Sequence, residues 1–308
     1  ATLSQFFGCS ALTSVTIGVL AVNQGFTGWI DNDLLKTNAV TKIIFAEGVN
    51  DVGDQSFQNK SSLQSVEFPV SATRIGNLAF QNCAGLTEIT ISKGIKSIAG
   101  NAFEGCVKLN AINVSDLNTA YSSEDGLLLN KNGETLIKCP EGKTGVCSLP
   151  EEVTIISGSA FRRCAGLTAV TMPEGLTGIG SHAFSECSGL TGFTIPASVT
   201  SIGSHAFSGC AGLTGIIIPK GVTAIGTFAF ADCQALRNVT IGERVASIGN
   251  SAFSGCKSLT SVEALGKGIP STVDVFKNSP AMIYYRPGAQ GWAPVWNDRF
   301  VRPIVEKP

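Results

Sequence analysis

The sequence predicts a β-rich solenoid in which 23-residue units stack around one continuous core. Three recurring residues predict it: a phenylalanine that usually follows alanine, a cysteine three residues later, and a leucine three residues after that. The phenylalanines are Phe6, Phe57, Phe80, Phe103, Phe161, Phe184, Phe207, Phe230, Phe253 and Phe276. One unit this short cannot bury a hydrophobic face by itself. A repeat at fixed spacing therefore indicates stacked units that share one core.

Each unit predicts the same elements in the same order. Two apolar residues separated by one follow the leucine, as in Ile89 and Ile91 or Phe193 and Ile195, and this alternation is typical of a short strand. Strands of neighbouring units would then pair in parallel, about 4.8 Å apart. A proline such as Pro196 often follows and ends the pairing, because proline has no N–H to donate. An Ile-Gly pair and the Ala-Phe pair are expected to form the return limb.

The units "LTGFTIPASVTSIGSHAFSGC" and "LTGIIIPKGVTAIGTFAFADC" resemble those of the BspA-type leucine-rich repeat family. This family comprises surface proteins of anaerobic bacteria and of some mucosal protists. The resemblance extends from Phe6 to about Phe276, with a degenerate unit that begins at Leu34. It implies a leucine-rich repeat solenoid, a right-handed coil with its parallel β-sheet on the concave face. It also implies a protein that is secreted or held at the cell surface and that takes part in adhesion.

Two segments depart from the repeat. Residues 116–150 are an insertion in which Asn132-Gly133, between two apolar runs, predicts a β-hairpin. This hairpin either covers an edge of the solenoid or contacts a ligand. Residues 276–308 hold a Tyr/Trp cluster that is expected to cap the open end, with carbohydrate binding as the alternative. The predicted domains are therefore residues 1–275, the solenoid with its insertion, and residues 276–308, the C-terminal cap.

Composition narrows the function. Charged residues make up 15% of the chain and the net charge is -1, so the basic stripe of a nucleic-acid-binding protein is missing. No apolar run reaches the roughly 18–20 residues of a membrane-spanning helix. The chain begins inside a repeat, and we expect a signal peptide to have been removed. The two histidines, His182 and His205, accompany no Walker loop, nucleophile elbow or HExxH motif, so no catalytic and no cofactor-binding residue is expected.

The ten cysteines divide into two groups. Eight occupy one repeat position that also accepts Thr37, Lys60 and Ser279, and this tolerance favours buried, reduced thiols over a disulfide framework. Cys139 and Cys147 lie in the insertion and are the candidate disulfide pair, with two reduced thiols as the alternative. Neither group has the spacing of a zinc site, so no metal-binding residue is expected.

The strand face is the candidate binding surface. Thr90, Thr171, Thr194 and Thr240 occupy outward positions between the paired apolar residues and form the candidate partner-binding face. These threonines serve strand propensity and cross-strand pairing, or they make a flat and weakly polar docking platform.

We expect an extracellular or cell-surface protein that binds a protein partner, such as an extracellular matrix protein or another surface protein. We expect it to act without catalysis and without a cofactor. A glycan is the second choice of ligand. The main alternative is a structural spacer that presents another domain, and the least favoured is a carbohydrate-binding or enzymatic site at the insertion and the aromatic cap.

Overall fold

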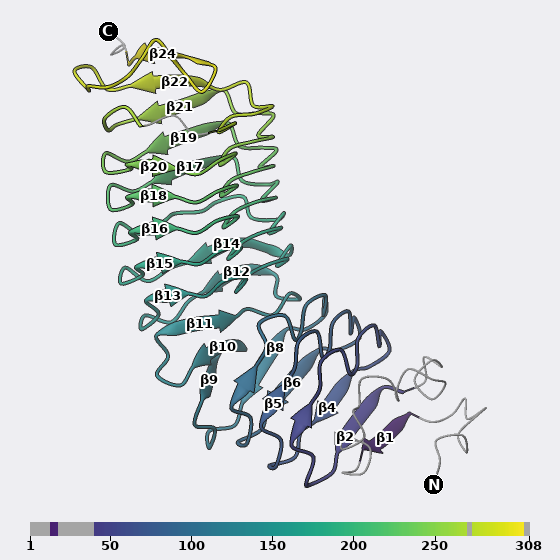
Figure 1. The fold of residues 1–308 in the computed structure, drawn as a ribbon. Helices are drawn as coiled ribbons and strands as arrows, with labels where there is room; N and C mark the ends of the chain where they lie inside the picture. The colour runs from purple at the N-terminus through teal and green to yellow at the C-terminus, as the bar shows by residue number, and fades with distance from the viewer. Residues whose placement is uncertain (1–12, 18–39, 270–272, 305–308) are drawn as a thin grey trace. The chain divides into compact units, whose positions relative to one another are not determined.

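The computed structural model describes residues 13–17, 40–269 and 273–304, and it confirms the predicted β-rich solenoid (Figure 1). All regular elements in these residues are β-strands, with turns between them and no helix. The chain divides into two compact units: residues 1–133 with 137–143, and residues 134–136 with 144–308. The described residues do not include four positions that the sequence analysis assigned to the repeat: Phe6, Cys9, Leu34 and Thr37.

In the first unit, successive turns of the chain add strands to a main sheet and to a minor ladder of two-residue strands. The main-sheet strands are β1 (Ser14–Ile17), β2 (Lys42–Phe45) and β4 (Ser65–Glu67), then the pair β6 (Glu88–Ile91) and β8 (Ala111–Val114), all parallel. The minor ladder is β3 (Asp51–Val52), β5 (Arg74–Ile75) and β7 (Ser97–Ile98), also parallel. The pairing advances by one repeat at each step, since Asp51 lies opposite Arg74 and Arg74 opposite Ser97.

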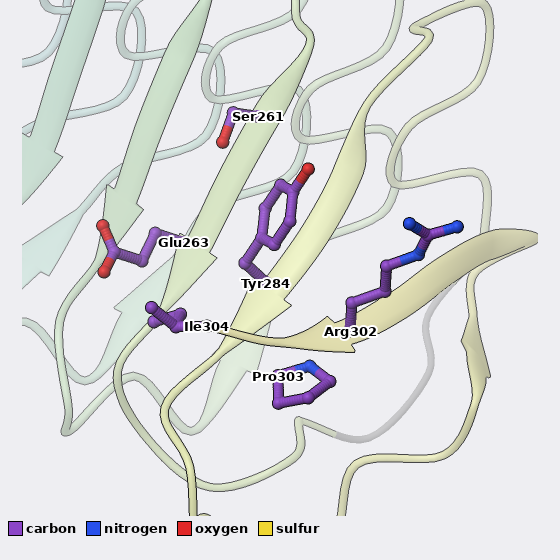
Figure 2. Close-up of a pocket in the computed structure, with 6 residues that line it drawn as sticks. All are labelled: Ser261, Glu263, Tyr284, Arg302, Pro303 and Ile304. Atoms are coloured by element: carbon purple, nitrogen blue, oxygen red, sulfur yellow. The ribbon is translucent and has the colours of Figure 1, made fainter. Parts of the chain in front are cut away.

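The second unit has the same two layers and a longer main sheet. The main-sheet strands are the parallel pair β12 (Gly145–Ser148) and β14 (Leu167–Thr171), then the parallel series β17 (Gly215–Ile218), β19 (Asn238–Ile241), β21 (Ser261–Ala264), β22 (Met282–Tyr285) and β24 (Arg299–Pro303). A short strand, β23 (Val295–Trp296), pairs antiparallel with β24. The minor ladder is β13 (Ile155–Ile156), β15 (Gly178–Ile179), β16 (Ser201–Ile202), β18 (Ala224–Ile225) and β20 (Ser247–Ile248). Figure 2 shows the last strands of the main sheet side by side.

The insertion contains two tight turns. The strands β9 (Tyr121–Glu124) and β10 (Leu127–Asn130) form an antiparallel hairpin around Asp125-Gly126. Both turn residues have positive φ, 51° and 72°, as a two-residue type I′ turn requires. The predicted turn at Asn132-Gly133 forms as well, since the Gly133 N–H donates to the Asn130 carbonyl at 3.0 Å. β11 (Thr135–Lys138) follows this turn.

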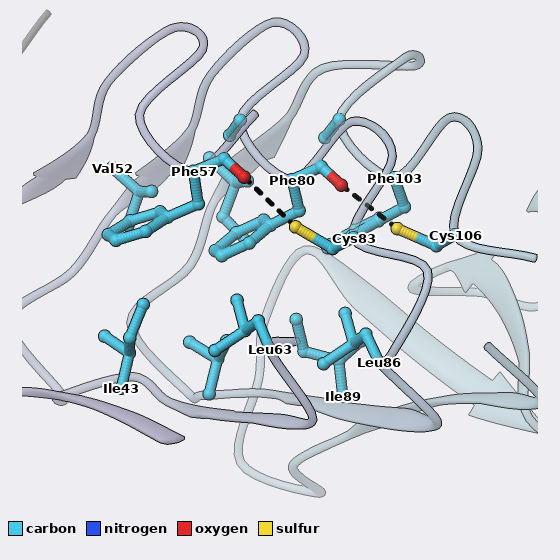
Figure 3. Close-up of a cluster of buried hydrophobic side chains, with 14 of the residues drawn as sticks. Ile43, Val52, Phe57, Leu63, Phe80, Cys83, Leu86, Ile89, Phe103 and Cys106 are labelled. Carbon is cyan, nitrogen blue, oxygen red and sulfur yellow. Dashed lines mark hydrogen bonds between the residues drawn. The ribbon is translucent and has the colours of Figure 1, made fainter. Parts of the chain in front are cut away.

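The repeated phenylalanines form the core. In the first unit the rings of Phe57 and Phe80 stack with centroids 5.3 Å apart, and Phe103 continues the file (Figure 3). In the second unit the file runs from Phe161 to Phe276, with centroid separations of 4.6 to 5.6 Å. Burial of each ring contributes about 1.5–3 kcal/mol. The file therefore stabilises every turn of the solenoid and offers no exposed chemistry.

Main-chain contacts explain the Ala-Phe pair. The N–H of Phe184 donates to the carbonyl of Ala206 in the next turn at 2.7 Å, and Phe207 makes the same bond to Ala229. Both alanines are fully buried, so a larger side chain has no room there. The chain bends at left-handed residues two before and two after the phenylalanine, such as His205 and Gly209, with φ of 56° and 74°.

Close approach between turns explains the Ile-Gly pair. A Cβ on Gly226 would lie 2.4 Å from the Ser204 nitrogen, and one on Gly203 would lie 2.6 Å from the Ser181 nitrogen. No real Cβ contact is that short, and the obstructing atoms are main chain. A side chain at this position would therefore push neighbouring turns apart.

One predicted strand is missing. The sequence predicts a strand around Phe193 and Ile195, but residues 190–196 form no strand, and the main sheet is interrupted between β14 and β17. The prediction was wrong because Phe193 stands where other turns have valine or isoleucine. Its ring packs edge-on against Phe184 and Phe207, each with centroids 4.8 Å away. We attribute the loss of pairing to the extra volume of this ring.

Candidate binding face

The candidate site is the outward face of the main sheet in the second unit. Side chains alternate along a strand between the two faces of a sheet, and Ile216, Val239 and Val262 point into the core. Their neighbours must then point outward. Parallel pairing places these neighbours opposite one another in one row, which we call the outward row: Ile217, Thr240, Glu263, Tyr284 and Arg302.

The four predicted threonines all lie on the side of the solenoid that carries the main sheet. Thr90 is exposed on β6 of the first unit, whereas Thr171, Thr194 and Thr240 belong to the second unit, where Thr171 and Thr194 are exposed and Thr240 is half-buried. None of their hydroxyls forms a hydrogen bond with another described residue. The hydroxyl of Thr191, by contrast, donates to the carbonyl of the preceding turn. The four hydroxyls are therefore available to a ligand.

A hollow of about 400 Å³ opens on this face beside the missing strand. Phe193, Thr194, Ile195, Gly215, Ile216, Ile217, Asn238 and Thr240 line it. Ile217 leaves 68% of its surface exposed, whereas the equivalent positions of the neighbouring turns are Thr194 and Thr240. The main-chain N–H and C=O groups of residues 192–195 form no hydrogen bond with any other described residue. The hollow thus combines an exposed apolar side chain with unpaired main-chain groups.

Two glycines leave this part of the face without outward side chains. Gly192 and Gly215 occupy outward positions, and neither has positive φ. A Cβ on Gly192 would meet nothing within 4 Å, and one on Gly215 would make only an ordinary contact of 3.6 Å. Glycine weakens a strand, and in a strand it often marks close approach of a ligand or another backbone. The fold does not require glycine here, unlike at Gly226.

A second hollow, of about 510 Å³, lies at the far end of the outward row. Ser261, Glu263, Tyr284, Arg302, Pro303 and Ile304 line it (Figure 2). Glu263 and Arg302 come from strands on either side of β22, so the Tyr284 ring lies between a carboxylate and a guanidinium. Neither charge is paired with another described residue. The sequence analysis assigned the tyrosines to the cap and did not single out Arg302.

Comparison with known proteins shows the family to which the repeat belongs. The family model described as "BspA type Leucine rich repeat region" matches residues 29–125 and 143–279 in six copies, which is more than half of the chain. The chain belongs to the BspA-type leucine-rich repeat family. The comparison with curated proteins gave no match.

Three solved structures resemble this BspA-type protein. A leucine rich cell surface protein from Faecalibacterium prausnitzii A2-165 is 31% identical, with a TM-score of 0.67, over 86% of this chain and 69% of its own. A leucine-rich repeat protein from Eubacterium ventriosum is 21% identical, with a TM-score of 0.66, over 88% of this chain and 85% of its own. The pneumococcal vaccine antigen PcpA is 21% identical, with a TM-score of 0.66, over 96% of this chain and 80% of its own. The last two resemblances concern the fold alone.

The repeated cysteines of this BspA-type protein are buried thiols that hydrogen-bond to the phenylalanine file. The Cys83 thiol donates to the Phe57 carbonyl at 3.1 Å, and Cys106 does the same to Phe80 (Figure 3). Cys187, Cys210, Cys233 and Cys256 repeat this bond in the second unit. Burial raises the pKa of the Cys83 and Cys210 thiols to about 12, so both stay protonated. Among the described residues, the cysteines at this repeat position are free, buried thiols, in agreement with the prediction.

Cys139 and Cys147 are also buried as thiols, and they belong to different units. The disulfide between them stays a prediction, which the mass of the oxidised protein would test.

The two histidines stack on the return limb of this BspA-type protein. The rings of His182 and His205 are nearly parallel, with centroids 4.5 Å apart, and Phe228 continues the stack at 4.9 Å. Burial, and secondly the neighbouring His205, lower the pKa of His182. Two parallel rings cannot both direct a nitrogen at one ion between them. In the part of the chain that the structure describes, no group of three or more His, Cys, Asp or Glu residues is arranged to hold a metal.

The described residues contain no helix that is long and apolar enough to cross a membrane.

Proposed function

We propose that this protein is an extracellular or cell-surface binding protein that engages a protein partner through the outward face of its second unit. It is proposed to act by adhesion or docking, without catalysis and without a cofactor. The observation that carries the proposal is the hollow beside residues 192–195, where Ile217 is exposed and main-chain groups are unpaired. The family, and a relative described as a cell surface protein, support the location.

A polypeptide suits this hollow better than other classes of ligand. Ile217 offers apolar contact, and the free N–H and C=O groups of residues 192–195 offer hydrogen bonds that another main chain can complete. No basic residue lines the hollow, so it lacks the positive charge that pairs with phosphate or sulfate groups. The Phe193 ring packs against the core phenylalanines and leaves no aromatic platform for a sugar.

The predicted threonines have defined places in this proposal. Thr194 and Thr240 line the hollow and would contact the partner beside Ile217. Thr171 extends the face on β14, and Thr90 occupies the equivalent position in the first unit. Their uncharged hydroxyls keep the surface polar without repelling an apolar segment of the partner.

We further propose that residues 276–308 cap the second unit rather than bind carbohydrate. Trp296 is buried and packs edge-on against Phe276, the last ring of the file, with centroids 5.7 Å apart. The strand β23 pairs with β24 and covers one edge of it. Trp292 donates its indole N–H to the Gly266 carbonyl at 3.1 Å and packs on Trp296. These contacts use the aromatic groups internally.

The test is a solid-phase binding screen against extracellular-matrix proteins, bacterial surface proteins and a glycan array, with two matched variants. Ile217→Lys places a charge in the hollow. Ile155→Lys places the same charge on the minor ladder of the same unit, where Ile155 is 46% exposed. Burial of an isoleucine contributes about 1.5–3 kcal/mol, so we expect Ile217→Lys to weaken binding at least tenfold. Ile155→Lys should bind like the wild type.

Two results would contradict the proposal. Saturable binding that both variants weaken equally, or that neither weakens, would place the site elsewhere. No binding by the folded protein would favour the spacer, whose function lies in another domain.

A further inference from the structure

We infer that the partner presents an extended segment in the polyproline II conformation, with an aliphatic, a basic and an acidic residue at every third position. This inference rests on the proposed function and names the chemistry of the partner for the same face. It is carried by the order and spacing of Ile217, Glu263 and Arg302 along the outward row.

The two charges of the row lack partners among the described residues, although ion pairs form close by. Arg286, two residues after Tyr284, reaches Glu243 at 2.6 Å. Glu263 and Arg302, in contrast, face outward on the main sheet with Tyr284 between them and are joined to no other charged group among the described residues. A ligand that supplies a cation to Glu263 and an anion to Arg302 would satisfy both. Such complementarity fixes partner choice and orientation more than it adds affinity.

The spacing of the row selects the conformation of the ligand. Neighbouring parallel strands are about 4.8 Å apart. One strand lies between Ile217 and Glu263, and one lies between Glu263 and Arg302, so each gap is about 9.6 Å. A polyproline II helix rises about 3.1 Å per residue with three residues per turn, and returns a side chain to the same face after about 9.3 Å.

The other regular conformations fit less well. A β-strand returns a side chain to the same face after about 6.7 Å. An α-helix returns a side chain to the same face after three or four residues, about 5.4 Å, or after seven residues, about 10.5 Å.

The residues between the three anchors suit the same ligand. Tyr284 is half-buried, and its ring lies between the two charged positions (Figure 2). Polyproline II segments commonly dock against aromatic side chains, because the preformed helix loses little entropy on binding. Thr240 lies between Ile217 and Glu263 in the outward row, and its side chain is small enough to let the segment approach.

The test is selection from a phage-displayed random dodecapeptide library on the full chain, carried out in parallel on Glu263→Lys and Arg302→Glu. We expect peptides enriched on the wild type to show aliphatic-x-x-basic-x-x-acidic, in one or the other chain direction. On Glu263→Lys the middle position should become acidic, and on Arg302→Glu the last position should become basic. A synthetic wild-type peptide should bind Glu263→Lys at least tenfold more weakly. The same peptide with its basic residue changed to glutamate should regain that affinity.

Other outcomes overturn the inference. A signature that stays the same on both charge variants would show that Glu263 and Arg302 do not read the segment. Spacings of two, four or seven residues would show a strand or a helix instead. Failure to enrich any peptide would also reject an extended segment. The proposed function is judged separately, because a folded partner sensitive to Ile217→Lys but not to Ile155→Lys would still support it.

Discussion

Replacement of one of the repeated cysteines tests whether its sulfur acts as a hydrogen-bond donor or only as a small apolar group. Cys210 is fully buried, and its thiol donates to the Phe184 carbonyl at 3.1 Å. That carbonyl also accepts the Cys187 N–H at 3.2 Å, so it keeps one donor when the thiol is removed. Loss of the second hydrogen bond costs about 0.5–1 kcal/mol, and loss of the buried sulfur costs about 0.8 kcal/mol more.

We therefore expect Cys210→Ala to lower the free energy of unfolding by about 1–2 kcal/mol. Cys210→Ser keeps the donor and should cost about 0.5–1 kcal/mol less than the alanine variant. The measurement is urea unfolding followed by circular dichroism, with the midpoints compared at an unchanged m-value. A serine variant less stable than the alanine variant would refute the reasoning, because that order is expected of a purely apolar site.

Ser279 provides the reciprocal control, because it occupies the same repeat position. Its hydroxyl donates to the Phe253 carbonyl at 2.6 Å and accepts the Cys256 N–H at 2.9 Å. Ser279→Ala leaves that N–H without a partner and should cost about 1–3 kcal/mol. Ser279→Cys should be milder than Ser279→Ala.

Three further predictions concern the fold of the second unit. The lowered pKa of His182 means that the unfolded chain takes up its proton first, so stability is at its full value above about pH 7 and falls as the pH drops through the ordinary value of 6.5. Urea midpoints at pH 7.5 and 5.5 should show this fall in stability, and His205→Ser should make it smaller. An equal fall in the variant would show that His205 does not lower the pKa of His182. Phe193→Ile should restore main-sheet pairing and slow amide exchange of residues 192–195, and unchanged exchange would show that the ring does not cause the interruption. Gly226→Ala should destabilise by about 1–3 kcal/mol, whereas Gly192→Ala should change stability by less than about 0.5 kcal/mol, as measured by urea unfolding.

The repeat predicts those parts of the fold that every turn shares. Phe184 and Phe207 stack where the period places them, and Cys210 lies beside them as a buried thiol. Each of these positions recurs many times, so exceptions do not obscure the pattern. The resemblance to the BspA-type family rests on the same recurring positions, and the family match agrees with it.

Features that occur once were harder to predict. The interruption of the main sheet follows from the volume of the Phe193 ring, and a pattern that counts Phe, Ile and Val alike as apolar cannot detect it. Arg302 joins the outward row only because β24 pairs with β22 after an irregular segment, and no repeat spacing predicts that register. The same holds for Tyr284, which belongs both to the predicted cap and to the main sheet.

The central claim is that a partner docks on the outward face of the second unit beside residues 192–195. Amide hydrogen exchange on the free protein and on its complex with the partner found in the binding screen tests this most directly. The amides of residues 192–195 have no hydrogen-bond acceptor among the described residues, so they should exchange fast in the free protein and at least tenfold more slowly in the complex. The Phe207 N–H, bound to the Ala229 carbonyl on the return limb, should not change. Protection confined to the return limb or to the insertion, with residues 192–195 still exchanging fast, would contradict the claim.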